Sequence, residues 1–206
     1  MARKKYVGPV MAAAAILIWA ALALVGGPLN NLDLGAIQML AAERLAHPWL
    51  TRAGIWASFL GSAEVTLPLT FLAVMFLLWR RRPIHAAVLF AAVLSERVLV
   101  EYLKVWIGRP RPDPAFQAAA LQSLAFPSGH AANSMTAFVA IALFCAPKPE
   151  RRVALIAAIG ASVLVGLSRP LLGVHWPSDV LGGWIFGLLW AVGGWRIAGR
   201  FEIRSA

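Results

Sequence analysis

The stretch SRPLLGVHWPSDVLGGW, residues 168–184, places groups capable of acid–base or nucleophilic chemistry in an otherwise apolar chain. Asp179 follows His175 by four residues, and Pro177 between them is typical of the first position of a helix. One helical turn therefore lets the Asp179 carboxylate reach the His175 imidazole. A carboxylate on one ring nitrogen fixes the tautomer and raises the basicity of the other nitrogen, as in a histidine that acts as nucleophile or base.

A second stretch, FPSGHAANS, combines a predicted helix start with another histidine. Ser128 and Gly129 offer backbone N–H groups with little side-chain bulk, an arrangement suited to an anion. His130 follows directly and is available as an acid. Three cations complete the set, and they are Lys104, Arg111 and Arg169. Two histidines, two helix starts and three cations predict an oxyanion pocket, with phosphate as its guest.

These residues fall into three motifs in a fixed order. They are K-x6-R-P at 104–112, P-S-G-H at 127–130 and S-R-x5-H-x3-D at 168–179. In this order they resemble the type 2 phosphatidic acid phosphatase superfamily, which includes membrane lipid phosphatases and soluble vanadium haloperoxidases. HPWL at 47–50 and SERVLVEYLKVWIGRPRPD at 95–113 extend the resemblance, toward bacterial phosphatidylglycerophosphatase B-type enzymes, over nearly the whole chain.

The resemblance implies a two-step reaction that uses no metal and no cofactor. His175 attacks phosphorus to form a phosphohistidine, and Asp179 orients it. His130 protonates the leaving lipid oxygen and then activates water. The implied ligands of the phosphoryl oxygens are Lys104, Arg111, Ser128, Gly129 and Arg169.

The composition indicates that a membrane surrounds this site. Of the 206 residues 60% are apolar and only 14% are charged, and the mean hydropathy is +0.73. The formal charge of +10 does not indicate nucleic-acid binding, because the basic residues lie in clusters between apolar runs and form no patch on a polar face. The one cysteine, Cys145, lies inside an apolar run, so the chain has no disulfide framework.

The apolar runs predict an all-α bundle of six transmembrane helices in a single domain, 1–206. The expected spans are 7–27, 53–79, 84–107, 131–146, 153–167 and 180–195. The last three runs are shorter than the roughly 18–20 residues that a span needs, so each must continue into its polar neighbour. A basic flank also makes 7–27 a candidate signal peptide, but no clear cleavage site follows it.

The charge pattern orients the predicted bundle. Four basic clusters mark the cytoplasmic side by the positive-inside rule: Arg3, Lys4 and Lys5; Arg80, Arg81 and Arg82; Lys148, Arg151 and Arg152; and Arg196, Arg200 and Arg204. With six spans both termini are cytoplasmic, and all three motifs meet at the outer face of a bacterial inner membrane. Between the first two spans, Leu34, Ile37, Ala41 and Leu45 predict a short amphipathic helix on the outer surface, which either guides a lipid or is a packed connector.

The sequence leaves other functions to be weighed. A small transporter would spread its polar groups through the midplane, and a metal hydrolase on His130, His175 and Asp179 would not gather three cations around its metal. A lipid phosphotransferase is the main alternative, since the same motifs serve it. The lipid itself stays open between phosphatidylglycerophosphate, undecaprenyl diphosphate, phosphatidate and lipid A phosphate.

The sequence leaves the roles of four further charged residues open, and no obligate protein partner is evident. Arg97 and Glu101 are spaced to pair within the bundle, where Glu96 could join them, or they have a supporting role near Lys104. Glu64 is open to either a structural or a supporting role.

Overall fold

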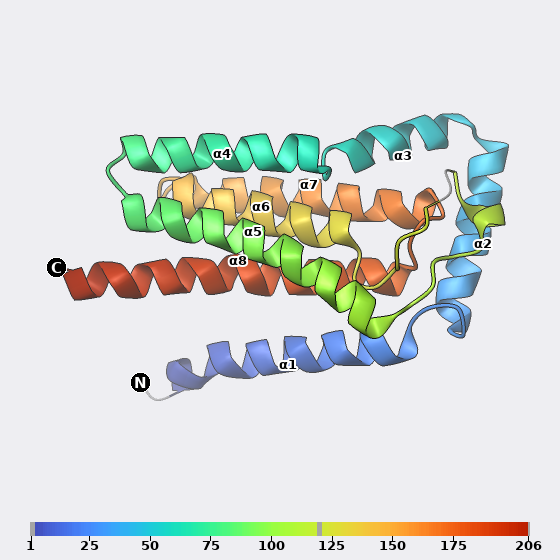
Figure 1. Cartoon of the computed structure of the whole chain (residues 1–206), viewed down its shortest axis with the longest axis horizontal. Helices are drawn as coiled ribbons and strands as arrows, with labels where there is room; N and C mark the ends of the chain where they lie inside the picture. Colours follow the sequence, from blue (N-terminus) through green and yellow to red (C-terminus); the bar gives the residue numbers. More distant parts are fainter. Residues whose placement is uncertain (1–2, 119–120, 206) are drawn as a thin grey trace.

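The computed structural model describes residues 3–118 and 121–205, with side chains for 8–118 and 121–201. Within this part of the chain every regular element is helical, which confirms the predicted all-α class. The long helices lie side by side, with both termini at one end and α2 across the other (Figure 1). The elements are α1 (Arg3–Val25), α2 (Asn31–Ala46), α3 (Trp49–Phe59), α4 (Ala63–Trp79), α5 (Pro83–Ile107), the 3-10 turn η1 (Pro114–Phe116), α6 (Gly129–Cys145), α7 (Arg151–Leu171) and α8 (Pro177–Ser205).

Five segments of the described chain are long and apolar enough to cross a membrane. They are Gly8–Val25, Trp49–Trp79, Pro83–Ile107, Arg151–Leu171 and Pro177–Phe201. The protein is therefore a multi-pass membrane protein. The remaining predicted span, 131–146, corresponds to α6, a shorter apolar helix of 17 residues, and its crossing stays a prediction. The side chains of Arg3, Lys4, Lys5 and Arg204, which belong to the predicted cytoplasmic clusters, lie outside the described residues.

The last three helices continue into polar sequence, as predicted from their short apolar runs. α6 begins at Gly129, α7 runs through Arg169 to Leu171, and α8 begins at Pro177. Proline is favoured at a first helical position because its ring fixes φ and the missing N–H has no helical partner there. The extra turns therefore hold polar side chains on rigid helix ends.

The predicted span at 53–79 lies within the apolar segment Trp49–Trp79, but it is not one continuous helix, because the chain breaks at residues 60–62. α3 ends at Phe59 and α4 begins at Ala63, with Ser62 in an extended conformation before it. The cause lies in packing. A Cβ on Gly61 would collide with Val165 of α7 and lie 3.3 Å from the backbone oxygen of His130, so only glycine lets this junction approach so closely.

The helix α2 packs against the rest of the protein through one face, as expected of a connector, and its predicted role in guiding a lipid stays a prediction. Its N-terminus is capped by Asn30, whose side chain accepts hydrogen bonds from two backbone N–H groups. Its buried residues are Asp33, Ile37, Ala41 and Arg44, so two charged side chains face the protein. Leu45, predicted on the apolar face, is 79% exposed.

The helix α6 lies at the centre of the bundle and is buried along most of its length. Two glycines of α8 allow this packing. A Cβ on Gly183 would lie 2.7 Å from the Ser128 oxygen, and one on Gly187 would lie 2.5 Å from the Ala132 oxygen. Small residues spaced four apart let membrane helices approach closely. The start of α6 is thereby held against the start of α8.

Candidate active site

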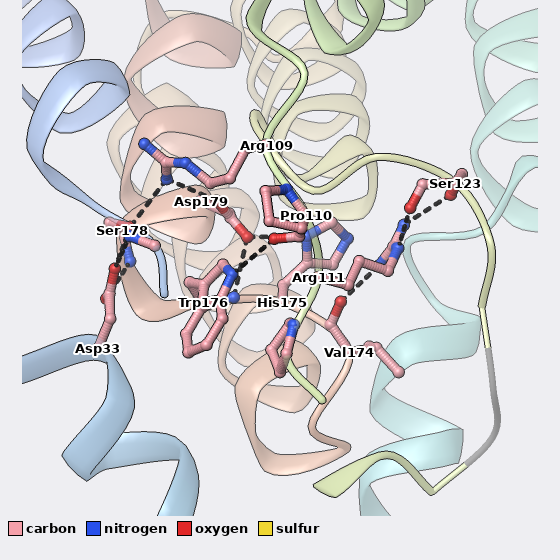
Figure 2. Close-up of polar contacts among 12 residues, drawn as sticks. Asp33, Arg109, Pro110, Arg111, Ser123, Val174, His175, Trp176, Ser178 and Asp179 are labelled. Carbon is pink, nitrogen blue, oxygen red and sulfur yellow. Dashed lines mark hydrogen bonds and ion pairs between the residues drawn. The ribbon is translucent and has the colours of Figure 1, made fainter. Parts of the chain in front are cut away.

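His175 lies in the turn between α7 and α8 and is 2% exposed. Asp179 stands in the first turn of α8, and its Oδ2 is 3.3 Å from Nδ1 of His175. The same oxygen accepts a hydrogen bond of 2.8 Å from the Trp176 backbone N–H, which fixes the carboxylate. With Nδ1 turned to Asp179, Nε2 is the ring nitrogen left for chemistry (Figure 2).

The second Asp179 oxygen contacts a residue that the sequence analysis assigned no role. Nη1 of Arg109 lies 2.7 Å from Asp179 Oδ1, and both side chains are buried. Arg109 and Arg111 stand two residues apart in the sequence RPRP, and residues two apart in an extended segment point to the same side. The sequence pattern therefore gave no signal that the two arginines serve different partners.

Arg111 turns toward the loop that joins η1 to α6. Its guanidinium donates to the backbone oxygen of Val174, next to His175, and to the backbone and side-chain oxygens of Ser123 (Figure 2). The backbone near it is fastened by the Trp176 indole, which donates to the Pro110 oxygen at 2.8 Å. Arg111 is thus anchored beside the His175 turn.

The other two predicted cations come from the ends of α5 and α7. Lys104 is 7% exposed, and its Nζ lies 2.6 Å from Glu101 Oε1. A Cβ on Gly129 would lie 3.3 Å from the same Nζ, so Lys104 reaches the first residue of α6. Arg169 is 6% exposed and donates from Nη1 to Ser58 Oγ of α3.

Among the described residues, Ser128 Oγ and Arg169 Nε are buried polar atoms with no hydrogen-bond partner, and both can donate. An unpaired buried polar group is costly, so such groups indicate a missing ligand or water. The Ser128 N–H is not available to an anion, because it donates to the Asp179 backbone oxygen at 3.0 Å. Gly129 starts α6, where N–H groups have no partner within the helix.

His130 occupies the first turn of α6 and is partly exposed. Its strongest electrostatic neighbours are Arg169, Lys104 and Arg111. The same three cations act on His175. The structure therefore brings all eight predicted site residues to the end of the bundle that lies opposite the chain termini.

Burial lowers the pKa of His175 well below its ordinary value, and the positive charges of Arg111, Arg169 and Lys104 lower it further. The imidazole is therefore neutral at neutral pH. With its Nδ1 proton directed to Asp179, its Nε2 carries a lone pair. A neutral imidazole with a free lone pair is the form that can attack an electrophile.

The predicted pairing of Arg97 with Glu101 is wrong. Arg97 donates to Thr66 Oγ1 of α4, while Glu101 pairs with Lys104 one turn further along α5. The spacing along α5 allows Glu101 to pair with either Arg97 or Lys104. Glu101 pairs with Lys104 because Arg97 instead contacts the neighbouring helix α4. Glu96 is fully buried with both carboxylate oxygens unpaired, and Glu64 stands in the first turn of α4. Across the described residues, no group of three or more His, Cys, Asp or Glu side chains could hold a metal ion.

Residues 85–202 match the model of the PAP2 superfamily, and this range contains all three motifs. The chain belongs to the PAP2 superfamily. It is 36% identical over 155 residues to phosphatidylglycerophosphatase B of Bacillus subtilis, covering 72% of this chain and 75% of that protein.

Two further PAP2 relatives carry different names. The chain is 38% identical over 112 residues to a lipid A 1-phosphatase of Rhizobium etli, covering 49% of this chain and 45% of that protein. It is 29% identical over 170 residues to an undecaprenyl-diphosphatase of Sulfolobus acidocaldarius, covering 80% and 78%.

The PAP2 fold is shared with a solved structure over nearly the whole chain. The crystal structure of a transmembrane PAP2 type phosphatidylglycerolphosphate phosphatase from Bacillus subtilis matches with a TM-score of 0.78 at 28% identity. The match covers 94% of this chain and 96% of that chain, so it includes α1 and α2, which precede the PAP2 range.

Proposed function

We propose that this protein is a membrane lipid phosphatase that removes the terminal phosphate of a lipid phosphate or diphosphate through a phosphohistidine intermediate. The observation that carries the proposal is the arrangement of charged and polar groups around His175. A neutral, carboxylate-paired histidine stands among three cations where two buried donors, Ser128 Oγ and Arg169 Nε, have no partner. The names of the relatives, all lipid phosphatases, support the same class of substrate.

In the first step Nε2 of His175 attacks phosphorus while the bond from phosphorus to the lipid-side oxygen breaks. The electron pair of that bond stays on the oxygen, and His130 donates a proton to it. Asp179 accepts the Nδ1 proton of His175 in a hydrogen bond and stabilises the positive charge that the ring gains. The lipid leaves as an alcohol, or as a monophosphate when the substrate is a diphosphate.

In the second step water attacks the phosphohistidine. The phosphorus–nitrogen bond breaks, its electrons return to Nε2 of His175, and a proton of the water passes to His130. Lys104, Arg111 and Arg169 bind the phosphoryl oxygens in both steps, together with Ser128 Oγ and the Gly129 N–H. Preorganised cations and donors of this kind stabilise the charge that develops in the transition state.

The reaction as written needs no metal and no cofactor. Three cations around the phosphoryl group supply the charge stabilisation that a divalent ion supplies in metal phosphatases. They would also repel such an ion. We therefore infer that phosphate release continues in the presence of a chelator.

The proposed location is the bacterial inner membrane, with the single domain 1–206 placing its site at the periplasmic face and both termini in the cytoplasm. The positive-inside rule supports this orientation. In the structure, Arg80, Arg82, Lys148 and Arg151 line a cavity of about 200 Å³ where α4 ends and α5 and α7 begin, at the other end of the helices that carry the site. The proposed partners are the lipid substrate and the bilayer, with no nucleic acid and no obligate protein partner.

A substrate panel tests this function. Purified protein is incubated, with a chelator present, with phosphatidylglycerophosphate, undecaprenyl diphosphate, phosphatidate and lipid A phosphate, and with His175→Ala protein as the blank. We expect inorganic phosphate from at least one lipid, and roughly 10³-fold less from the blank.

Two results would contradict the proposal. Loss of activity in the chelator with recovery on adding a divalent metal would contradict the metal-free reaction. Phosphate that appears on an added acceptor lipid, with no free phosphate, would identify a phosphotransferase instead.

A further inference from the structure

We propose that Arg109 is a positioning residue for the His175–Asp179 pair, and that it links this pair to the end of α1 and the start of α2. Arg109 holds Asp179 as an anion aimed at His175 and touches no phosphate itself. The proposal rests on the proposed function, since it concerns the carboxylate that orients the attacking histidine.

Protein groups accept most of the hydrogen bonds that the Arg109 guanidinium can donate. Nη1 donates to Asp179 Oδ1 at 2.7 Å and to Ser178 Oγ at 3.0 Å. Nη2 donates to the backbone oxygens of Leu22 at 2.5 Å and Ala23 at 2.8 Å. Four of its five N–H bonds are thus used, and the guanidinium carbon lies 4.3 Å from the centre of the Phe126 ring. Arg109 therefore has little left to offer a phosphate, unlike Arg169, whose Nε is unpaired.

The need for Arg109 follows from the burial of Asp179. The Asp179 side chain is 0% exposed, and a carboxylate away from water is strongly disfavoured unless it is paired. His175 does not supply the pairing charge, because burial, and after it the neighbouring cations, keep its ring neutral. Arg109 is the cation in direct contact with Asp179, so it compensates the negative charge that the imidazole needs as its hydrogen-bond acceptor.

Arg109 also has partners that lie outside the three motifs. Leu22 and Ala23 lie in the last turn of α1, where the backbone oxygens carry the negative end of the helix dipole. The Leu22 oxygen also accepts from the Gly26 N–H at 3.1 Å. Asp33 of α2 then accepts from the Ser178 N–H at 3.0 Å and from its hydroxyl (Figure 2). The Arg109 guanidinium, the Ser178 hydroxyl and the Asp33 carboxylate form one chain of hydrogen bonds beside Asp179.

Close backbone approach confirms that this end of α1 is built against α8. A Cβ on Gly26 would collide with the Ser178 side chain, and Gly27, with φ of 102°, would bring one to 3.1 Å from Cδ of Arg109. The Gly27 N–H also donates to Asp33 at 2.7 Å. The PAP2 range is 85–202. The end of α1 and the start of α2 lie before this range, and they complete the surroundings of the attacking histidine.

A purely structural latch is the alternative, and Arg44 provides a matched control for it. Arg44 is also buried, at 8% against 5% for Arg109, and also donates to two backbone oxygens, those of Leu172 and Phe116. It contacts no carboxylate of the site. Removing either arginine removes a buried latch, but only removing Arg109 leaves Asp179 without its counter-charge.

The test is a double-mutant cycle on the full-length protein. We compare wild type, Arg109→Met, Asp179→Asn, the double variant, Arg109→Lys and Arg44→Met, with short-chain phosphatidate as substrate and vanadate as the phosphate-site probe. We expect Arg109→Met to lower kcat and the rate of phosphoenzyme formation by about 10- to 10³-fold, with KM and the vanadate inhibition constant within threefold. When Arg109→Met is added to the Asp179→Asn protein, kcat should fall no further, because Arg109 acts through the Asp179 carboxylate.

The controls separate the remaining outcomes. Arg109→Lys should recover part of kcat, and it substitutes for Arg109→Met if that variant does not fold. Arg44→Met should lower the unfolding temperature and leave kcat within twofold. Independent, multiplicative losses in the double variant, or a tenfold weaker vanadate inhibition in Arg109→Met, would overturn the proposal. If wild type itself forms no phosphoenzyme, the proposed function has failed; if wild type does and Arg109→Met matches it, only the role of Arg109 has failed.

Discussion

His175 and His130 are the same residue type in two different settings, and the difference assigns their parts in the proposed reaction. His175 is buried, neutral and hydrogen-bonded to a carboxylate, which prepares it to attack. His130 is partly exposed at the start of α6 and has no hydrogen-bond partner among the described residues. Two titratable groups with contrasting environments are the usual basis for a division between base and acid.

The lowered pKa of His175 makes a prediction about pH. Because the nucleophile must be unprotonated and its pKa lies below the ordinary 6.5, the acid limb of kcat/KM that belongs to His175 should fall below pH 6.5. A phosphate monoester loses its second proton near pH 6, so titration of the substrate falls in the same pH range as the limb expected for His175. The profile is therefore measured with phosphatidate and with a lipid diphosphate, and only a limb common to both is assigned to the enzyme. A common acid limb above pH 7 would show that His175 is protonated in the free enzyme.

The contacts between residues close in the sequence were predictable from their spacing. The contacts between residues far apart in the sequence were not. Asp179 lies one helical turn from His175, so a pattern of four residues was enough to pair them. Arg109 is 70 residues from Asp179, and Asp33 is 145 residues from Ser178. No periodicity of the sequence links such positions.

At the scale of the helix, the contact between α6 and α8 determines where His130 stands relative to Asp179. Gly183 and Gly187 let the two helices touch backbone to backbone, and the Ser128 N–H donates to the Asp179 backbone oxygen. A side chain at either glycine would push apart the two helix starts that carry the site.

Gly187→Ala should therefore destabilise the protein and lower its activity. Its methyl group meets the Ala132 oxygen at 2.5 Å and Met135 Cβ at 3.0 Å, an overpacking that costs about 1–3 kcal/mol. Gly193→Ala on the same helix is the matched control, since a Cβ there meets nothing within 4 Å and alanine favours the helix by up to about 1 kcal/mol. Thermal unfolding and phosphate release are measured for both variants. Equal unfolding temperatures would show that this glycine contact does not hold the two helices.

The helices themselves were predictable from the apolar runs, and their polar extensions from the shortage of apolar residues. The break at 60–62 was not, because 53–79 is nearly all apolar and its interruption depends on Gly61 packing against Val165 and the His130 backbone. The burial of Arg44 in α2 was missed for the same reason, since its partners are backbone oxygens of distant loops.

At the scale of the whole molecule, the two ends of the bundle differ in charge and chemistry. One end holds the basic residues that line the small cavity, and the other holds the predicted site. This polarity is what the proposed orientation depends on, because the positive-inside rule assigns the basic end to the cytoplasm.

Cysteine labelling in spheroplasts tests the orientation. In a Cys145→Ala background, Ala115→Cys, exposed on η1 beside Gln117, should react with a membrane-impermeant maleimide from outside. Pro149→Cys, exposed between α6 and α7 at the opposite end, should react only after the membrane is permeabilised. The reverse pattern would place the site in the cytoplasm.

The most direct test of the central claim is to trap the phosphoenzyme on the two histidine variants. Wild type, His175→Ala and His130→Ala are mixed with a radiolabelled lipid diphosphate, whose leaving phosphate needs less protonation, and are quenched in alkali. We predict label on wild type and on His130→Ala, mapped to His175, and none on His175→Ala. Label that survives in His175→Ala and disappears in His130→Ala would contradict the assignment of His175 as the nucleophile.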